Sequence, residues 1–236
     1  MLHSNVENML EKHTATLFST CLIDHQAEES ALFSLLSPDE IIRAERFRLK
    51  IHRQRFIVTR GLLRKQLSTY TRTPPQTIQF SYQHNGKPAL LDNPMNLHFN
   101  VSHSDDMAFF GFMLDHEIGV DIEKIRPHFN LKIAKRFFSR EEYSALLARP
   151  IAQQANAFYA IWSAKEALIK AAGAGIFSST SDFSVDLSQK KQTIFLHSDH
   201  YRIECVTIHP HYAAAIAVKT PTYFSPAYPS VWAPLK

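Results

Sequence analysis

Two acidic residues separated by one apolar residue are the first candidates for chemistry in this sequence. Within residues 119–123, Asp121 and Glu123 alternate with apolar neighbours. A β-strand with that alternation places both carboxylates on one face, about 7 Å apart along the strand. Two carboxylates at that separation can share one divalent cation, which relieves their mutual repulsion. An edge strand with a solvated acidic face is the alternative.

A glutamate and a lysine one helical turn apart form a second candidate group, about forty residues further along the chain. Residues 151–172 carry apolar side chains at the spacing of a buried helical stripe, and Gly173 follows as a typical helix end. Glu166 and Lys170 lie in a polar row beside that stripe, whereas Lys165 falls within it. Glu166 and Lys170 can form a surface ion pair worth roughly a few tenths of a kcal/mol. Alternatively, Glu166 is a third carboxylate for the cation and Lys170 binds a phosphate.

A dense run of basic residues follows a strong helix start in the first half of the chain. Ser37 is a predicted N-cap, Pro38 suits the first turn and Glu40 closes a capping box. We expect the helix that begins there to continue through the basic residues up to the proline pair at 74–75. A solvated basic face is the default interpretation of such a run. Its cations are Arg43, Arg46, Arg48, Lys50, His52, Arg53, Arg55, Arg60, Arg64 and Lys65.

The bulk composition is that of an ordinary globular protein. Of its 236 residues, 45% are hydrophobic and 20% are charged, which allows a buried core and argues against disorder. Cys21 and Cys205 are far apart, and without a signal peptide we expect free thiols in the cytoplasm. No apolar run approaches the ~20 residues of a membrane span. The formal charge of +4 suits an enzyme for a polyanionic cofactor or an acidic protein, and equally a weak nucleic-acid binder.

Three short motifs occur in order along the chain. They are F-N-V-S-H-S at residues 99–104, G-V-D-I-E at 119–123 and W-S-A-K-E-A-L-I-K at 162–170. Each alone is a weak signal, but their order, their spacing and the chain length together resemble the Sfp-type 4′-phosphopantetheinyl transferases. The resemblance implies an α+β fold of two similar halves related by a pseudo-twofold, with the active site in the cleft between them.

The resemblance also implies a reaction, in which 4′-phosphopantetheine moves from coenzyme A to a serine of an apo acyl or peptidyl carrier protein and adenosine 3′,5′-bisphosphate leaves. Mg²⁺ is the implied ion, with Mn²⁺ as a substitute. A cytoplasmic monomer that binds neither nucleic acid nor a membrane is expected. The implied metal ligands are Asp121, Glu123 and Glu166. The implied coenzyme A contacts are Arg43, Arg55, Lys87 of a G-K-P motif, Ser102, His103 and Lys170.

Several roles stay open at this point. The incoming serine must lose a proton, and Glu166, Glu142 and a metal-bound water are the candidate acceptors. Glu142 also closes a second predicted capping box, so it has a structural role of its own. We expect Lys170 to place a positive charge on the pyrophosphate, and Lys165 to help if its ammonium group leaves the apolar stripe. Glu40 stands where some family members carry a lysine, which leaves the contacts of the 3′-phosphate open.

The predicted elements run as helices followed by three strands, twice. We expect an N-terminal half over 1–110, a C-terminal half with the metal site over 111–219, and a tail over 220–236 packed as an extended strap. The strands at 107–114 and 118–123 should form a hairpin. Further expected elements are helices at 28–36, 131–137, 140–148 and 151–172, a turn at Asn85–Gly86, a loop over 173–182, and strands at 15–23, 77–82, 97–102, 183–186, 193–197, 201–208 and 212–218.

Two other functions compete with the carrier-protein reaction. A different Mg²⁺-dependent phosphotransferase or phosphodiesterase acting on a nucleotide would use the same acidic strand and lysines without any carrier protein. A basic RNA- or DNA-binding module would use the cations of residues 43–65. Such modules interleave exposed aromatic residues with their cations, whereas Phe47 and Phe56 fall where the helix needs apolar residues.

Overall fold

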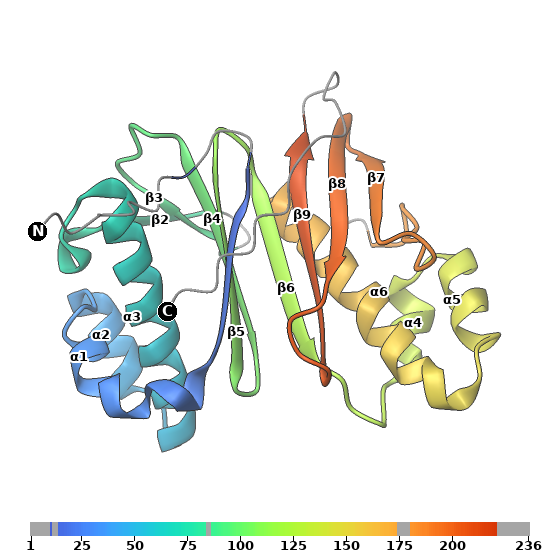
Figure 1. The fold of residues 1–236 in the computed structure, drawn as a ribbon, viewed down its shortest axis with the longest axis horizontal. Coiled ribbons are helices and arrows are strands. Elements are labelled where there is room, and N and C mark those ends of the chain that lie inside the picture. The colour runs from blue at the N-terminus through green and yellow to red at the C-terminus, as the bar shows by residue number, and fades with distance from the viewer. Residues whose placement is uncertain (1–9, 11–13, 84–85, 174–179, 221–236) are drawn as a thin grey trace, which may run out of the picture.

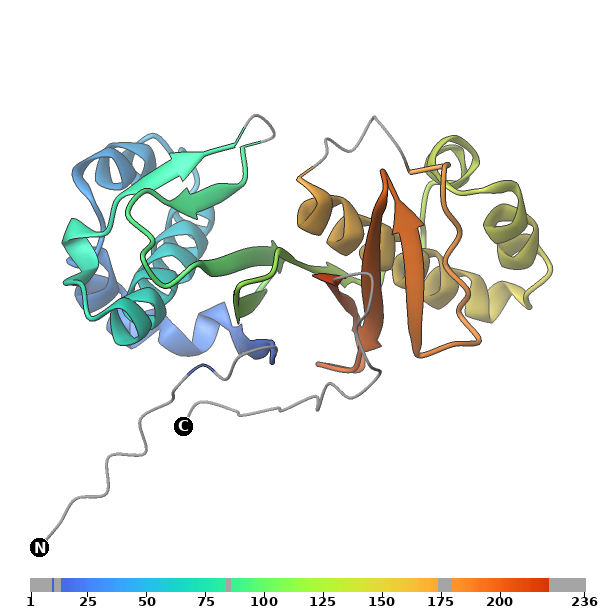
Figure 2. The ribbon, with the colours of Figure 1, turned by 90° about the horizontal axis from the view of Figure 1, so that it is seen from above.

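The computed structural model describes residue 10 and residues 14–83, 86–173 and 180–220. Strands lie between two groups of helices, α1–α3 on one side and α4–α6 on the other (Figures 1 and 2), which confirms the predicted α+β class. The first elements are β1 (Thr16–Cys21), η1 (Leu22–Glu28), α1 (Glu29–Phe33), α2 (Pro38–Glu45), α3 (Lys50–Thr71), η2 (Pro75–Thr77), β2 (Phe80–Tyr82), β3 (Pro88–Leu90), β4 (Leu97–Ser104) and β5 (Met107–Leu114). The later elements are β6 (Ile118–Lys124), α4 (Leu131–Phe137), α5 (Arg140–Leu147), α6 (Ile151–Ala172), β7 (Lys191–Leu196), β8 (Asp199–Val206) and β9 (Tyr212–Thr220).

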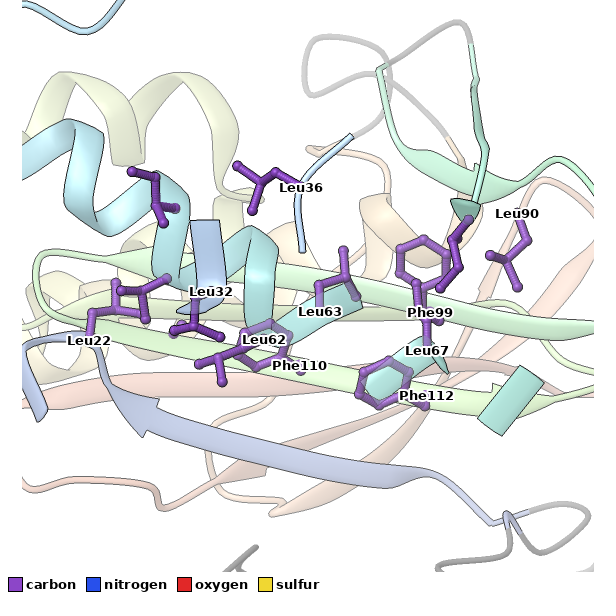
Figure 3. Packing of buried hydrophobic residues seen from close by; sticks show 14 of the residues in the cluster. Leu22, Leu32, Leu36, Leu62, Leu63, Leu67, Leu90, Phe99, Phe110 and Phe112 are labelled. Atoms are coloured by element: carbon purple, nitrogen blue, oxygen red, sulfur yellow. The ribbon is translucent and has the colours of Figure 1, made fainter. Parts of the chain in front are cut away.

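The first half is built on an antiparallel sheet of three strands in the order β1-β5-β4, beside a separate β2-β3 ribbon. The helix α3 turns one side toward this sheet. Leu63 and Leu67, one turn apart on α3, belong to the same buried cluster as Phe99 of β4 and Phe110 and Phe112 of β5 (Figure 3). This core fixes β4, whose other face carries Asn100, Ser102 and Ser104 of the predicted motif.

The second half is built on an antiparallel sheet of four strands in the order β6-β9-β8-β7. The long helix α6 packs across β6 and β9. The contact is made largely by alanines, with Ala164, Ala167 and Ala171 on α6 and Ala215 and Ala217 on β9 all buried in one cluster. Because alanine side chains are short, helix and sheet approach closely, and polar groups at the helix edge come within reach of β6.

The expected hairpin between residues 107–114 and 118–123 is wrong. β5 pairs with β1 and β4, whereas β6 pairs with β9 in the other sheet. The edge of β6 that does not pair with β9 contacts side chains of β4 and forms no backbone hydrogen bonds with a second strand. Asn100 Oδ1 accepts a hydrogen bond from the Val120 amide at 2.8 Å, and Ser104 Oγ accepts one from the Lys124 amide at 3.1 Å. These two side chains satisfy amides that a hairpin partner would otherwise bind.

The expected strand at 183–186 is also wrong, because side chains take its backbone groups. Lys165 Nζ donates to the Phe183 carbonyl at 2.7 Å, and the Val185 amide donates to Glu142 Oε1 at 2.6 Å. Those groups are therefore unavailable to a neighbouring strand. The residues between these contacts form irregular backbone.

The expected single helix through the basic run is divided in two. α2 ends at Glu45, Leu49 is extended, and α3 begins at Lys50. The bend allows Glu40 on α2 to meet Arg64 on α3 as a buried ion pair. This pairing requires two helices side by side, which one straight helix could not provide.

Other predictions at the sequence level hold. Glu40 and Glu142 both close capping boxes, and Gly173 ends α6 in the left-handed conformation. Cys21 and Cys205 are free thiols. Asn85 of the predicted turn, most of the loop over 173–182 and the predicted tail beyond Thr220 lie outside the described residues. In the described part of the chain, every helix is too short or too polar to cross a membrane.

Candidate active site

The motif on β4 and the acidic motif on β6 face each other. Ser102 Oγ donates to Asp121 Oδ1 and Ser104 Oγ donates to Glu123 Oε2, each at 2.9 Å. Both serines lie on the β4 face that carries Asn100, as the two-residue period of a strand requires. His103, between them in sequence, lies on the opposite face and lines a pocket described below. One face of β4 therefore contacts the acidic residues of β6, and the opposite face contributes to the pocket.

The glycine of the acidic motif allows α6 to lie directly against β6. A Cβ atom at Gly119 would overlap the Ala167 carbonyl oxygen and would lie 2.5 Å from the Ala171 amide nitrogen. Any side chain here would push the helix away from the strand. The absence of one brings Lys170, on the same turn of α6, over the backbone of β6.

Lys170 and Asp121 form the centre of this cluster. Lys170 Nζ lies 2.6 Å from Asp121 Oδ1 and donates to Ser102 Oγ at 3.2 Å. β6 is an edge strand of its sheet, but Asp121 is only 3% exposed, so the alternative of a solvated acidic face is wrong. Glu166 is 7% exposed, and Lys170 pairs with Asp121, so a surface Glu166–Lys170 pair does not describe the site either.

Two of the predicted metal ligands, Glu166 and Glu123, have raised pKa values. Burial raises the pKa of Glu166 to about 7; the charge of Lys170 opposes this rise, and those of Asp121 and Glu123 add to it. Burial and the neighbouring Asp121 likewise raise the pKa of Glu123. Lys170 therefore lies among carboxylates whose combined negative charge exceeds its own positive charge.

The donor set fits a divalent cation in its chemistry. Carboxylate oxygens are the hard ligands that Mg²⁺ prefers. Asp121 Oδ2 is buried and has no hydrogen-bond partner among the described residues, so one oxygen remains available for a cation. Within residues 14–83, 86–173 and 180–220, however, no group of three or more His, Cys, Asp or Glu side chains is gathered closely enough to hold a metal ion. The cluster thus supplies negative charge and one carboxylate oxygen, Asp121 Oδ2, that is available to a cation. Lys170 is the positive charge beside Asp121.

Glu142 and Lys165 lie in a separate, closed network. Lys165 Nζ pairs with Glu142 Oε2 at 2.9 Å, and the two side chains are 1% and 2% exposed. Glu142 also accepts from the amides of Ser139 and Val185. Lys165 Nζ donates further to the carbonyls of Thr180 and Phe183. Burial lowers the pKa of Lys165 and raises that of Glu142, while their mutual attraction opposes both shifts.

Lys87 is also held inside the protein. Its Nζ donates to Glu117 Oε2 at 2.7 Å and to the Ile118 carbonyl at 3.0 Å. Burial lowers the pKa of Lys87, and the charge of Glu117 opposes that change. The described contacts thus tie the G-K-P segment to the start of β6.

A pocket of about 180 Å³ lies beside the basic helices, and Arg43 and His103 line it. Apolar side chains form part of its wall, and the Arg43 guanidinium lies 5.2 Å from the centre of the Phe56 ring. Partial desolvation lowers the pKa of His103, and the charges of Lys170 and Arg55 lower it further. His103 thus lines the pocket and is close enough to Lys170 and Arg55 for their charges to act on it.

Arg55, the remaining predicted coenzyme contact, pairs with an acidic residue of the β4–β5 turn. Its Nη2 donates to Asp106 Oδ1 at 2.7 Å, and its Nε donates to the same oxygen at 3.1 Å. Both side chains are partly exposed. The pair connects α3 to the turn that follows His103.

Sequence reasoning missed several residues that build this arrangement. It assigned no role to Asn100, Ser104 and Gly119, although all three belong to its motifs. The period-two pattern N-x-S-x-S, compared with D-x-E on the neighbouring strand, is the signal that could have identified the two polar residues. Arg60, which lines the pocket, was indistinguishable from the other cations of its run.

Comparisons with known proteins agree on one family. A family model described as "4′-phosphopantetheinyl transferase superfamily" matches residues 117–217, and one described as "4′-phosphopantetheinyl transferase, N-terminal" matches residues 24–111. 4′-Phosphopantetheinyl transferase Sfp of Bacillus subtilis is 37% identical over 202 residues, which cover 84% of this chain and 88% of Sfp. The psf-1 enzyme of Bacillus pumilus is 37% identical over 181 residues, 75% of this chain and 76% of its own. HetI of Nostoc sp. is 41% identical over 148 residues, 61% of this chain and 62% of HetI.

Both halves of the chain are therefore matched by models of one enzyme family, and relatives of that family align along most of it. The chain belongs to the Sfp-type 4′-phosphopantetheinyl transferase family.

Proposed function

We propose that this protein transfers the 4′-phosphopantetheine group of coenzyme A to a serine hydroxyl of an apo acyl or peptidyl carrier protein, in a Mg²⁺-dependent reaction that releases adenosine 3′,5′-bisphosphate. The observation that carries the proposal is the cluster of Asp121, Glu123, Glu166 and Lys170 between β6 and α6 in a member of this family. This cluster supports a diphosphate site because it contains two kinds of group. Its carboxylates can bind a divalent cation, and its ammonium group can bind a phosphate.

In this proposal each half of the chain binds a different part of coenzyme A. Residues 1–110 supply the nucleotide pocket through Arg43, Arg55 and His103, and residues 111–219 supply the acidic cluster. Fixed cations at the nucleotide end hold a part of the substrate that does not react. Binding energy there positions the reacting phosphorus at the other end.

Asp121, Glu123 and Glu166 would hold the Mg²⁺ ion, whose charge offsets that of the pyrophosphate when bound, and Mn²⁺ is expected to substitute. Lys170 binds a pyrophosphate oxygen through Nζ, and Ser102 Oγ orients Asp121. Glu166 accepts the proton of the incoming serine at a carboxylate oxygen. Burial raises the pKa of Glu166 to about 7 in the protein without an ion, and a bound cation would lower it. The position of Glu166 beside Lys170 and Asp121 is what supports this role.

The buried pair of Glu142 and Lys165 supports a positioning role, which we propose in place of direct catalysis. Each of its charges already binds partners of the protein itself, and the pair joins α5, α6 and residues 180–185. Lys87 is a further proposed coenzyme contact, since its neighbour Pro88 lines the pocket.

The test is to incubate the protein with coenzyme A, Mg²⁺ and a purified apo-carrier protein and to measure the carrier by mass spectrometry. We expect a mass gain of one phosphopantetheine. Asp121→Ala and Glu166→Ala should each abolish the gain with circular dichroism unchanged, whereas Glu141→Ala, an exposed acidic residue on α5, should leave it intact. Release of nucleotide without carrier modification would favour a phosphodiesterase and contradict the proposal.

A panel of apo-carriers at equal concentration then ranks the substrates. Fatty-acid, polyketide and nonribosomal-peptide carriers should be compared by initial rate. The basic character of the chain suits the acidic helices of such carriers in general and favours none of the three classes.

A further inference from the structure

Four polar side chains, spaced two residues apart on one face of β4, contact β6 or the residue before it. Asn100, Ser102 and Ser104 do so through the hydrogen bonds described above. His98 makes the first of the four contacts, because its Nδ1 lies 3.3 Å from Oε1 of Glu117, and β6 begins at the next residue. Histidine is the residue type among these four that gains or loses a proton near neutral pH.

The partners of the His98 ring require a proton on each of its two nitrogens. Nε2 lies 3.1 Å from Asn96 Oδ1. The nitrogen of that amide donates to Asp115 Oδ1 at 3.2 Å, which turns the amide oxygen toward the ring. Nδ1 faces the carboxylate of Glu117. Amide and carboxylate oxygens accept hydrogen bonds, and a neutral imidazole carries a single N–H, so both contacts are favourable when the ring is an imidazolium.

Glu117 is a fixed anion beside this ring. Burial raises its pKa, but the hydrogen bond from His98 and the charge and hydrogen bond of Lys87 outweigh burial and lower the pKa to about 2. Lys87 Nζ donates to Oε2 at 2.7 Å, and the main-chain carbonyl of Glu117 accepts from the Lys219 amide at 2.9 Å. Glu117 therefore connects β9 of the second half to two cations of the first half.

A pocket of about 380 Å³ lies beside the contact, and His98 lines it, so the ring can exchange protons with solvent. Lys219 is paired with Asp199 at 2.7 Å, and the His200 ring lies 5.0 Å from that of Phe195. The acids of this pocket outnumber Lys219 and the nearby Lys87, so the surroundings favour a positive charge on His98. The other titratable side chains that line the pocket are Asp115, His116, Glu117, Asp199, His200 and Lys219.

We propose that His98 is a positioning residue for the active site, and that its imidazolium form fixes the start of β6 against β4. The inference rests on the function proposed above. Glu117 lies four residues before Asp121. His98 lies four residues before Ser102, the partner of Asp121, on the same face of β4. The contact therefore holds the two strands in the register that brings Ser102 and Asp121 together.

The sign of the pH dependence follows from the ring contacts. While the ring holds both protons, His98 can attract Glu117 and donate to Asn96. When the pH rises and one proton leaves, one ring nitrogen faces an acceptor without a hydrogen between them, so the contact weakens. The effect of His98 is thus present at lower pH and is lost as the pH rises.

NMR spectra of the ring nitrogens in the intact chain test the protonation state directly. At about pH 7, His98 should show two protonated ring nitrogens, a signal assigned by its absence from His98→Gln. Glu117→Gln removes the neighbouring anion, so His98 should lose its second proton at a lower pH in that variant than in wild type. A neutral His98 ring in wild type at this pH would overturn the inference.

Kinetics of carrier modification test the positioning role. At about pH 6.5, kcat should fall about 3- to 10-fold in His98→Gln, as expected for the loss of one partly exposed ion pair. The KM for coenzyme A should stay within about 2-fold, because the pocket lined by His103 lies on the opposite face of β4. His98→Arg keeps a charge and donors in two directions, so it should retain about half or more of the wild-type kcat.

The pH profile distinguishes this role from a purely structural one. The ratio of the wild-type kcat to that of His98→Arg should fall as the pH rises from about 6 to 9, because the wild-type ring loses its charge and the guanidinium does not. Titration of Glu166 is common to both proteins and cancels in the ratio. His200→Gln is the matched control in the same pocket, and its profile should follow that of wild type.

The outcomes separate the inference from the proposed function. If wild type modifies no carrier, the proposed function fails, and the ring spectra decide whether the contact depends on protonation. If wild type modifies the carrier but His98→Gln keeps the full kcat, or the ratio to His98→Arg is constant with pH, the inference alone is overturned. If His98→Gln does not fold, the ratio to His98→Arg decides, with His98→Lys in its place should that variant also fail to fold.

Discussion

Helix α6 carries two lysines in two different acidic environments. Lys165 pairs with Glu142 in a network where carbonyls and amides of the protein bind the remaining positions of both charges. Lys170 pairs with Asp121, one of whose oxygens is buried with no partner in the described part of the chain. The pKa of the nearby Glu166 is raised to about 7.

The difference lies in how completely each network satisfies its own charges. A closed network stabilises the fold, and its groups are unavailable to a substrate. A network with a buried oxygen that has no partner is less favourable for folding and can bind an external cation. A lysine–carboxylate pair therefore stabilises the fold at Lys165 and Glu142, whereas a pair of the same residue types can bind a substrate or an ion at Lys170 and Asp121.

Removing Lys165 should have the largest effect on stability. Lys165→Met leaves Glu142 charged, buried and without its ion partner, so the free energy of unfolding should fall by about 3–5 kcal/mol. Urea denaturation followed by circular dichroism measures it. The double variant Lys165→Met/Glu142→Gln should recover part of the loss. A loss below about 1 kcal/mol in the single variant would mean that the network does not support the fold.

Replacing Asp121 should show the opposite pattern. Asp121→Asn keeps the shape of the side chain and removes the charge, so kcat should fall about 100- to 1000-fold, which corresponds to about 2.7–4 kcal/mol. The free energy of unfolding should change by less than about 1 kcal/mol, because Lys170 is partly exposed and can be hydrated. Transfer assays and urea denaturation on one preparation measure both quantities. A large loss of stability with normal kcat would reverse the comparison.

Gly119→Ala should affect both networks through the position of α6. The added Cβ overlaps backbone atoms of the helix, and overpacking of this kind costs about 1–3 kcal/mol. Because the helix must move, transfer should also slow. Gly111→Ala is the comparison variant, since the nearest atoms to its Cβ would belong to the side chains of Val120 and Ile118 and not to the backbone of a helix. Equal losses in the two variants would argue against a specific contact between Gly119 and α6.

Breaking the ion pair of Lys87 and Glu117 should have the smallest effect of these changes on the free energy of unfolding. Burial raises the pKa of Glu117, but hydrogen bonding from His98 and the charge and hydrogen bond of Lys87 outweigh it and lower the pKa to about 2. A lowered pKa in the folded state contributes stability above the ordinary value near 4.5, and this contribution is lost as the pH falls from there toward 2. Wild type should therefore exceed Glu117→Gln in stability at pH 7 by on the order of 1 kcal/mol. Thermal unfolding at pH 7 and pH 3 tests it, and a difference that does not shrink at pH 3 would contradict this role.

Much of the fold and the site was predictable from local patterns. Helical spacing indicated α6 and its end at Gly173, and the alternation of residues 119–123 indicated a strand with Asp121 and Glu123 on one face. Short-range geometry determines these features, so a few neighbouring residues are enough. The hairpin at 107–123 failed because partner choice depends on residues far away, here Asn100 and Ser104, whose side chains take the amides of β6.

The sequence by itself determined which residue types are present and how they repeat: an acidic strand, a lysine-bearing helix and a run of cations. Only the tertiary structure decided which of these charges meet. It placed Lys165 in a closed pair, Lys170 beside Asp121, and Glu40 against Arg60. The physical reason is that the strength of an ion pair depends on separation and burial, and chain spacing sets neither once the chain folds back on itself.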